Sequence, residues 1–146
     1  MKTKILSIII FIVACSNSKV EKPQNEKTEN NVVSDIGIGP IKKVEISENI
    51  DMKLVEEGKK VFELKCTACH KLEERYVGPA LKGITKRRKP EWIMNMILNP
   101  IEMTQKDPIA KQLLSEYLTQ MTYQDIKENE ARAILEYFRY IDREGK

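Results

Sequence analysis

The chain has 146 residues, of which 41% are hydrophobic and 32% charged. This length allows one domain of ordinary size with terminal extensions, and the composition excludes a membrane protein with many spans. The formal net charge is +3, and loss of an N-terminal signal containing two lysines would lower it to +1. We therefore expect no nucleic acid partner.

Residues 1–14 have the pattern of an N-terminal targeting signal. Two early lysines precede an apolar run that is too short to cross a bilayer as a helix. The run ends in Ile12-Val13-Ala14-Cys15, which resembles the bacterial lipobox. The resemblance implies cleavage before Cys15 and lipidation of its thiol, so we predict a lipoprotein anchored to a membrane outside the cytoplasm, in the periplasm or cell envelope. The alternative is an ordinary signal peptide with an incidental cysteine.

The next segment, residues 15–49, is predicted to be a flexible tether followed by a strap. Residues 16–31 are rich in Lys, Glu, Asn, Gln and Ser and contain no aromatic residue. Such a stretch cannot bury enough apolar surface to offset its ordering entropy. Residues 33–50 mix Ile and Val with two glycines and a proline, and we expect an extended strap there, across the domain predicted for 50–146.

An amphipathic helix is predicted at the start of that domain. Its expected apolar face comprises Leu54, Val55, Gly58, Val61 and Phe62. Gly58 has no side chain, so it leaves room for a partner helix to approach.

The pentapeptide Cys66-Thr67-Ala68-Cys69-His70 follows this helix. C-x-x-C-H is the attachment signature of c-type haem. The two thiols add across the haem vinyl groups, and the adjacent histidine is held under the ring, where Nε2 can bind iron. We therefore predict one covalent haem c, held by Cys66, Cys69 and His70.

Other uses of the two cysteines fit the sequence less well. A thioredoxin-like dithiol would need a βαβ context, whereas the preceding residues continue a helix. A structural zinc site needs four ligands, but the chain has one histidine and only one further cysteine, the predicted lipid anchor. A disulfide between Cys66 and Cys69 would close a very small, strained loop.

From about Ile50 to Asp142, the chain resembles class I cytochrome c. In that family a helix before the motif crosses the last helix, and a small and an aromatic residue on the first meet an aliphatic and an aromatic residue on the second. Gly58, Phe62, Ile134 and Tyr137 fit those roles. The apolar face of the last helix comprises Ala131, Ile134, Leu135, Tyr137, Phe138 and Ile141. The resemblance implies an all-α, cytochrome c-like fold with helices wrapped around one haem.

The resemblance also implies roles for residues that follow the motif. The proline carbonyl of a similar Gly-Pro accepts the Nδ1 proton of the proximal histidine and so orients it, which here gives Pro79 as the partner of His70. Leu81 would pack on the haem face. Similar bacterial cytochromes use an arginine and an indole N–H to hold the haem propionates, and Arg87 and Trp92 are the candidates. Arg87 belongs to the basic run Lys86-Arg87-Arg88-Lys89. The alternative interpretation of this run is a solvated surface with no haem contact.

The sixth ligand of the iron is expected in a loop before the last helix, where the family places an axial methionine. Met121 lies in the stretch Tyr117–Gln124, which we predict to be non-helical, and thioether ligation suits electron transfer. Many family members have Met-Pro at this point, whereas Thr122 follows here, so the loop lacks a fixed φ angle.

The other methionines are weaker candidates for that ligand. Met103 follows Pro100 in a predicted loop and is the second choice. Met94 and Met96 fall on a predicted apolar helix, where core packing is the better interpretation. A site without a sixth protein ligand is the remaining alternative.

The predicted function is electron transfer, not enzymatic catalysis. The resemblance implies that the protein shuttles single electrons between membrane-associated donors and a terminal oxidase or reductase. Its expected partners are redox proteins, with the membrane contacted through the lipid at Cys15. The alternative is a haem enzyme or gas-binding protein with an open distal site.

Overall fold

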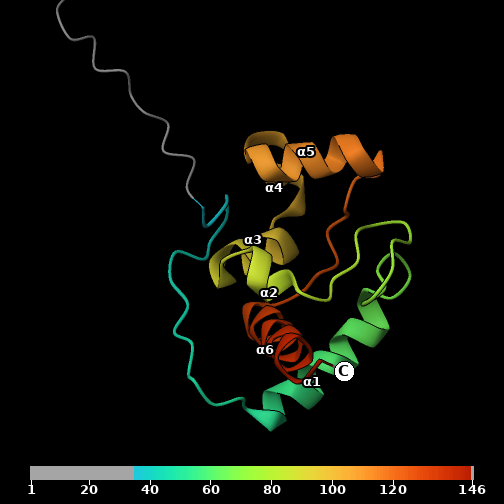
Figure 1. Cartoon of the computed structure of the whole chain (residues 1–146). Coiled ribbons are helices and arrows are strands. Elements are labelled where there is room, and N and C mark those ends of the chain that lie inside the picture. The colour runs from blue at the N-terminus through green and yellow to red at the C-terminus, as the bar shows by residue number, and fades with distance from the viewer. Residues whose placement is uncertain (1–34, 146) are drawn as a thin grey trace, which may run out of the picture. The chain divides into compact units, whose positions relative to one another are not determined.

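The computed structural model describes residues 35–145, and within that range it contains six helices and no strand. The helices are α1 (Met52–Lys65), α2 (Ile84–Arg87), α3 (Pro90–Leu98), α4 (Pro100–Lys106), α5 (Pro108–Tyr117) and α6 (Glu128–Glu144) (Figure 1). The all-α prediction is confirmed. No helix among the described residues is long and apolar enough to cross a membrane. The predicted signal peptide, Cys15 and the predicted tether lie outside the described residues.

Helix α1 begins at a side-chain cap and ends directly at the cysteine motif. The carboxylate of Asp51 accepts hydrogen bonds from the backbone N–H groups of Lys53 and Leu54, at 2.9 and 3.3 Å. At the other end the N–H of Cys66 donates to the carbonyl of Phe62 at 2.9 Å. The first cysteine is therefore fixed by the last turn of this helix.

Helices α1 and α6 pack closely against each other (Figure 1). A Cβ atom built on Gly58 would overlap the carbonyl of Ala133 and lie 2.8 Å from the backbone nitrogen of Ile134, so only glycine allows this approach. The ring of Phe62 lies 5.7 Å from the ring centroids of both Tyr137 and Phe138, a separation typical of favourable aromatic pairs. The family resemblance assigned this contact to Gly58, Phe62, Ile134 and Tyr137, and the structure brings these four residues together.

Helices α3, α4 and α5 each begin with a proline. Proline suits this position because its φ angle is already helical and its missing N–H would have no partner there.

The sequence predicted Met103 in a loop, which is wrong, because Pro100 starts a short helix that buries Met103 completely. Tyr117 was also predicted to be non-helical and is the last residue of α5; the chain leaves the helix at Leu118, where φ is +52°.

Residues 35–50 run as an extended strap over α3, α4 and α6 (Figure 1). Its main anchor is the fully buried side chain of Asn95, which accepts from the N–H of Ile41 and donates to the carbonyls of Ile36 and Ile41, each at 2.9 Å. Ile41 is itself buried in the core. The strap therefore satisfies a polar group that α3 would otherwise bury unpaired.

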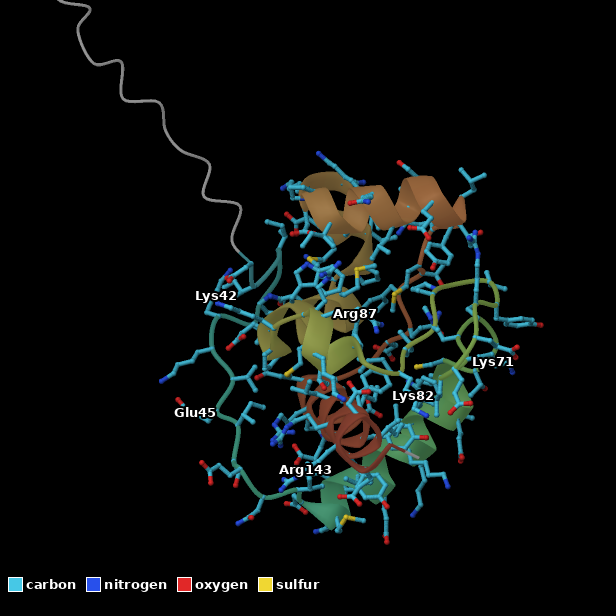
Figure 2. All side chains as sticks on the ribbon, viewed as in Figure 1. Lys42, Glu45, Lys71, Lys82, Arg87 and Arg143 are labelled. Atoms are coloured by element: carbon cyan, nitrogen blue, oxygen red, sulfur yellow. The ribbon has the colours of Figure 1, made fainter. Side chains whose placement is uncertain are left out.

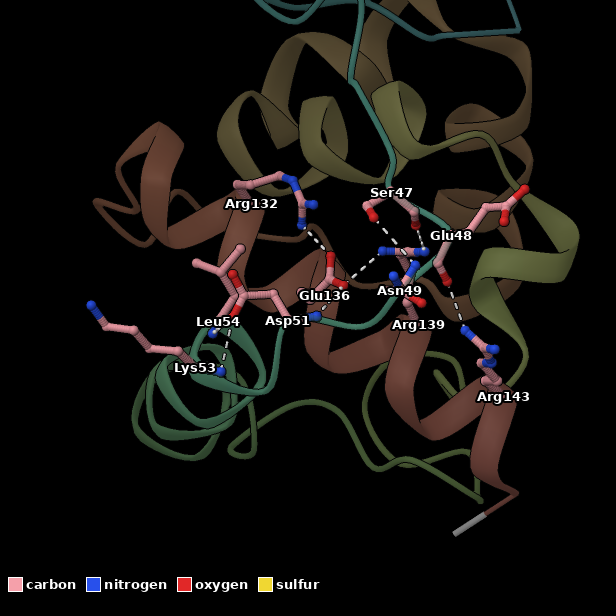
Figure 3. A network of polar contacts seen from close by, with 10 residues as sticks. All are labelled: Ser47, Glu48, Asn49, Asp51, Lys53, Leu54, Arg132, Glu136, Arg139 and Arg143. Atoms are coloured by element: carbon pink, nitrogen blue, oxygen red, sulfur yellow. Dashed lines mark hydrogen bonds and ion pairs between the residues drawn. The ribbon is translucent and has the colours of Figure 1, made fainter.

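A buried carboxylate joins α6 to the strap and to the start of α1 (Figure 3). Glu136 is 1% exposed and receives Arg132 Nη1 at 2.5 Å, Arg139 Nη1 at 2.7 Å and the N–H of Asp51 at 3.2 Å. Arg139 also donates to the carbonyl of Ser47 at 2.5 Å. This network fixes the end of the strap against the helix pair that carries the cysteine motif.

Candidate haem-binding site

A cavity of about 310 Å³ lies between the cysteine motif, helices α2, α3 and α5, and the segment that joins α5 to α6. The side chains of its wall are mainly apolar and come from elements far apart in the sequence. They include Leu81, Ile84, Trp92, Ile93, Leu113, Ile134 and Phe138. A second, more open depression of about 530 Å³ lies beside Glu63, Leu72 and Tyr137, and it contains neither cysteine. The first cavity is therefore the candidate site.

The cysteine motif turns tightly after α1 so that Cys66, Cys69 and His70 all line the cavity. The N–H groups of Cys69 and His70 both donate to the carbonyl of Cys66, at 3.1 and 2.9 Å. The two cysteines are not joined by a disulfide. Burial raises the pKa of the Cys66 thiol to about 11, the opposite of what a reactive redox dithiol requires.

The ring of His70 is oriented by the chain segment behind it. Its Nδ1 lies 3.1 Å from the carbonyl oxygen of Pro79. Because a carbonyl can only accept, Nδ1 carries the proton and Nε2 is left with its lone pair. Burial lowers the pKa of His70, partly opposed by the bond to Pro79, and this shift favours the neutral imidazole that can bind a metal.

A glycine is required next to this ring. A Cβ atom on Gly78 would lie 2.5 Å from Cε1 and 2.9 Å from Nδ1 of His70. The backbone of Gly78 donates to the carbonyl of Cys69 at 2.9 Å, which holds the Gly-Pro segment against the motif.

Two methionines line the cavity, Met121 and Met96. Met121 comes from the segment between α5 and α6, as the sequence predicted, and Met96 comes from α3. Met103, the second choice from the sequence, does not line it, and its sulfur accepts a hydrogen bond from the N–H of Ile38 at 2.9 Å. Met94 is buried and does not line the cavity either. Met96, not Met103, is therefore the second candidate for the sixth ligand beside Met121.

The two residues expected at the propionates have other partners in this structure. Arg87 is exposed (Figure 2). Its guanidinium donates to the carbonyls of Lys82 at 2.8 Å and Ala80 at 3.2 Å. Trp92 lines the cavity, but its indole N–H donates to the buried carboxylate of Asp107 at 3.2 Å. Arg87 does not line the cavity, and the single N–H of Trp92 is directed to Asp107.

These residues fit a covalently attached haem. The cavity offers two thiols separated by two residues of the chain, one imidazole with an unprotonated nitrogen, one thioether in a loop and an apolar wall for a porphyrin. Among residues 35–145, no group of three or more His, Cys, Asp or Glu side chains could hold a bare metal ion.

Comparison with known proteins gives the same result. Residues 55–142 match the family model for cytochrome c. The chain belongs to the cytochrome c family. As a cytochrome c domain it holds covalently bound haem c, whose iron supplies a one-electron Fe(III)/Fe(II) couple, and it is a haem electron carrier.

Solved cytochromes c are similar over most of the chain. Cytochrome c from Rhodothermus marinus is 48% identical, with a TM-score of 0.72, over 77% of this chain and 95% of that chain. An engineered form of that cytochrome, bound to a carbene intermediate, is 47% identical, with a TM-score of 0.69, over 76% and 95%. The cytochrome c domain of the pp3183 protein from Pseudomonas putida is 25% identical, with a TM-score of 0.53, over 59% and 88%. No curated protein matches the chain.

Sequence reasoning missed the polar residues of the cavity wall. Thr104, Gln120 and Lys65 all line the cavity, yet none belongs to a motif or breaks a hydrophobic pattern. Only the fold brings them together, since Thr104 and Lys65 come from different helices and Gln120 from a loop.

Proposed function

We propose that this cytochrome c is a lipid-anchored, monohaem carrier that moves single electrons between membrane-associated donors and a terminal oxidase or reductase. The proposal has three parts: a six-coordinate iron with His70 and Met121 as axial ligands, electron transfer through an exposed edge of the site, and attachment to a membrane at Cys15.

One observation carries the proposal most directly: His70 and Met121 line the same apolar cavity. An iron with both axial positions filled by protein side chains has no open position for a substrate, which favours electron transfer over bond chemistry. Met121 is the better candidate than Met96, because it lies in a loop that can adapt to a ligand, whereas Met96 is fixed on α3 among core side chains.

The edge of the cavity at Cys69 supports transfer to a partner protein. Cys69 is exposed, and Val77, which also lines the cavity, is 36% exposed. A partner protein that docks at this exposed edge could therefore exchange electrons with the haem without forming a covalent bond. A tether to the membrane would keep this edge near membrane-bound partners and raise its effective concentration there.

The axial assignment is tested on the purified haem protein with Met121→Ala, Met96→Leu and Met103→Leu. Methionine bound to Fe(III) haem gives a weak far-red absorption band. We expect Met121→Ala to abolish the band and lower the midpoint potential, while the two Leu variants retain the band. Loss of the band in Met96→Leu with retention in Met121→Ala would transfer the axial role to Met96.

The anchor is tested separately by Cys15→Ser. We expect the variant to leave the membrane fraction with an unchanged visible spectrum, because the lipidation signal precedes the haem domain. If it pelleted with membranes as fully as the wild type does, another feature of the chain would be the anchor.

The second candidate function is a haem enzyme with an open distal site. The solved structure of an engineered Rhodothermus marinus cytochrome c with a bound carbene intermediate shows that the site of a relative can accept a reactive ligand. For this chain, that function requires a high-spin haem and no far-red band in the wild type.

A further inference from the structure

The loop that carries Met121 lacks the usual backbone support. It spans residues 118–127, between α5 and α6. In the described structure, no backbone–backbone hydrogen bond involves an N–H of residues 119–127. Two of its residues, Leu118 and Asp125, have φ angles of +52° and +51°, which side-chain-bearing residues adopt at some cost. The conformation of this loop must therefore be held by side chains.

One such contact lies directly beside Met121. The side-chain amide of Gln120 donates to the carbonyl of Met121 at 2.9 Å. Because only the NH₂ group can donate to a carbonyl, the amide oxygen of Gln120 faces the other way. There it lies 2.9 Å from the hydroxyl of Thr104, which can donate to it.

Thr104 gives this contact a rigid base. It is 5% exposed and lies on α4, where the N–H of Asp107 closes the last turn by donating to the carbonyl of Met103 at 2.8 Å. Its hydroxyl also lies 3.0 Å from the carbonyl of Pro100 and 2.9 Å from that of Ile101, so its single proton is shared between helix and loop. Thr104, Gln120 and Met121 all line the cavity.

We propose that Thr104 and Gln120 form a clamp that holds Met121 in position to bind the iron. Both are positioning residues, since they act through Met121. The clamp would compensate for Thr122, which stands where a proline would have fixed the backbone. A third residue, Lys65, donates to the carbonyls of Gln124 and Asp125, both at 3.1 Å. These contacts hold the loop after Met121, so the part of the loop at Met121 itself depends on the clamp.

The inference rests on the proposed axial role of Met121, and imidazole tests the two separately. Imidazole binds ferric haem only when the methionine is displaced, so its apparent affinity rises with the fraction of detached methionine. The affinity is measured on the intact haem protein from the loss of the far-red band, and in Met121→Ala, which lacks the band, from the shift of the main haem absorption.

We expect Thr104→Val, which removes one partly buried hydrogen bond to the loop, and Gln120→Leu, which removes two, each to raise the apparent imidazole affinity about three- to tenfold. The double variant should show no more than the larger single effect, because the two residues act as one unit. Thr104→Ser keeps the hydroxyl and should behave like the wild type. Gln105→Leu, the same kind of change on an exposed position of α4, is the matched control and should have no effect.

Imidazole affinities within about twofold of wild type in both Thr104→Val and Gln120→Leu, below the effect expected for a lost, partly buried hydrogen bond, would overturn the clamp. If those variants are unchanged but Met121→Ala binds imidazole much more tightly, the axial role stands and only the clamp fails. If Met121→Ala also matches the wild type, the axial role itself is wrong. A variant that lowers stability in urea without changing imidazole affinity likewise counts against the clamp.

Discussion

The Nδ1 atom of His70 lies 3.1 Å from the carbonyl oxygen of Pro79, and Gly78 approaches the same ring so closely that a Cβ atom on it would lie 2.5 Å from Cε1. The hydrogen bond fixes the tautomer and the direction of the ring, and the glycine makes room for it. Together they determine where the free Nε2 points, so the Gly-Pro segment would act on an iron bound to Nε2 through this one imidazole.

Gly78→Ala should therefore disturb the axial histidine more than the fold. The new methyl group would overlap the imidazole at a distance of 2.5 Å from Cε1, and the ring must tilt or lose its bond to Pro79. We expect a shifted midpoint potential and an altered haem spectrum, with the helical circular dichroism retained. Ala80→Gly, in the same segment, is the control. An unchanged potential in Gly78→Ala would mean that the segment does not set the orientation of His70.

Covalent attachment should depend on both cysteines. Because Cys66 and Cys69 are the thiols that line the cavity, we expect Cys69→Ser to give little normal haem c and the Cys66→Ser, Cys69→Ser double variant to give none. The measurement is haem staining after denaturing electrophoresis, with Cys15→Ser as the matched cysteine control. A double variant that stains like the wild type would refute this assignment.

The crossing of α1 and α6 should be sensitive to a single methyl group. In Gly58→Ala the added atom meets backbone of Ala133 and Ile134, which cannot rotate away as a side chain could. We expect the free energy of unfolding to fall by about 1–3 kcal/mol, measured by urea denaturation. Lys60→Ala, on the exposed side of the same helix, should change it by less than about 0.5 kcal/mol. Equal effects of the two variants would mean that the helices can move apart freely.

Glu136 should make stability depend on pH in the acid range. Burial opposes its ionisation, but the hydrogen bonds from Arg132, the N–H of Asp51 and Arg139 outweigh it and hold the pKa of Glu136 below its usual value. A depressed pKa in the folded state gives stability that is present above the unfolded pKa of about 4.3 and is lost as the pH falls through the folded pKa.

The test compares the wild type with Glu136→Gln in urea at pH 7 and at several values below 4. We expect the variant to be less stable at pH 7 by about 1–3 kcal/mol, as for a buried charged hydrogen-bond acceptor, and the difference to shrink as the pH falls. Glu45→Gln, on the exposed part of the strap, should show no such trend. A difference that stays constant from pH 7 to pH 3 would remove Glu136 as the source of the acid sensitivity.

The long helices and the covalent part of the site could be predicted from the sequence because their signals are local. The apolar residues of α1 and α6 recur at helical spacing, and C-x-x-C-H identifies its ligand within five residues. Helix α4 could not be predicted, since seven residues between two prolines carry too little periodicity. Its burial of Met103 followed from tertiary packing against Ile38 of the strap.

The polar partners of the site were beyond sequence reasoning for a similar reason. A donor such as the indole of Trp92 can serve a haem propionate or a buried carboxylate, and only the position of Asp107 at the start of α5 decides between them. Asn95 likewise looks like an ordinary polar residue in an apolar helix. Its role appears only when the strap, more than 50 positions earlier, lies beside it.

The most direct test of the account is a spectroelectrochemical titration of the wild-type protein with its haem attached. The iron is proposed to have two protein ligands and to exchange one electron at a time. We predict a single reversible transition that follows the Nernst equation for one electron, with the far-red band of methionine ligation present in the oxidised form and absent in the reduced form. An oxidised protein with a high-spin spectrum and no far-red band would contradict it and favour an enzyme with an open distal site.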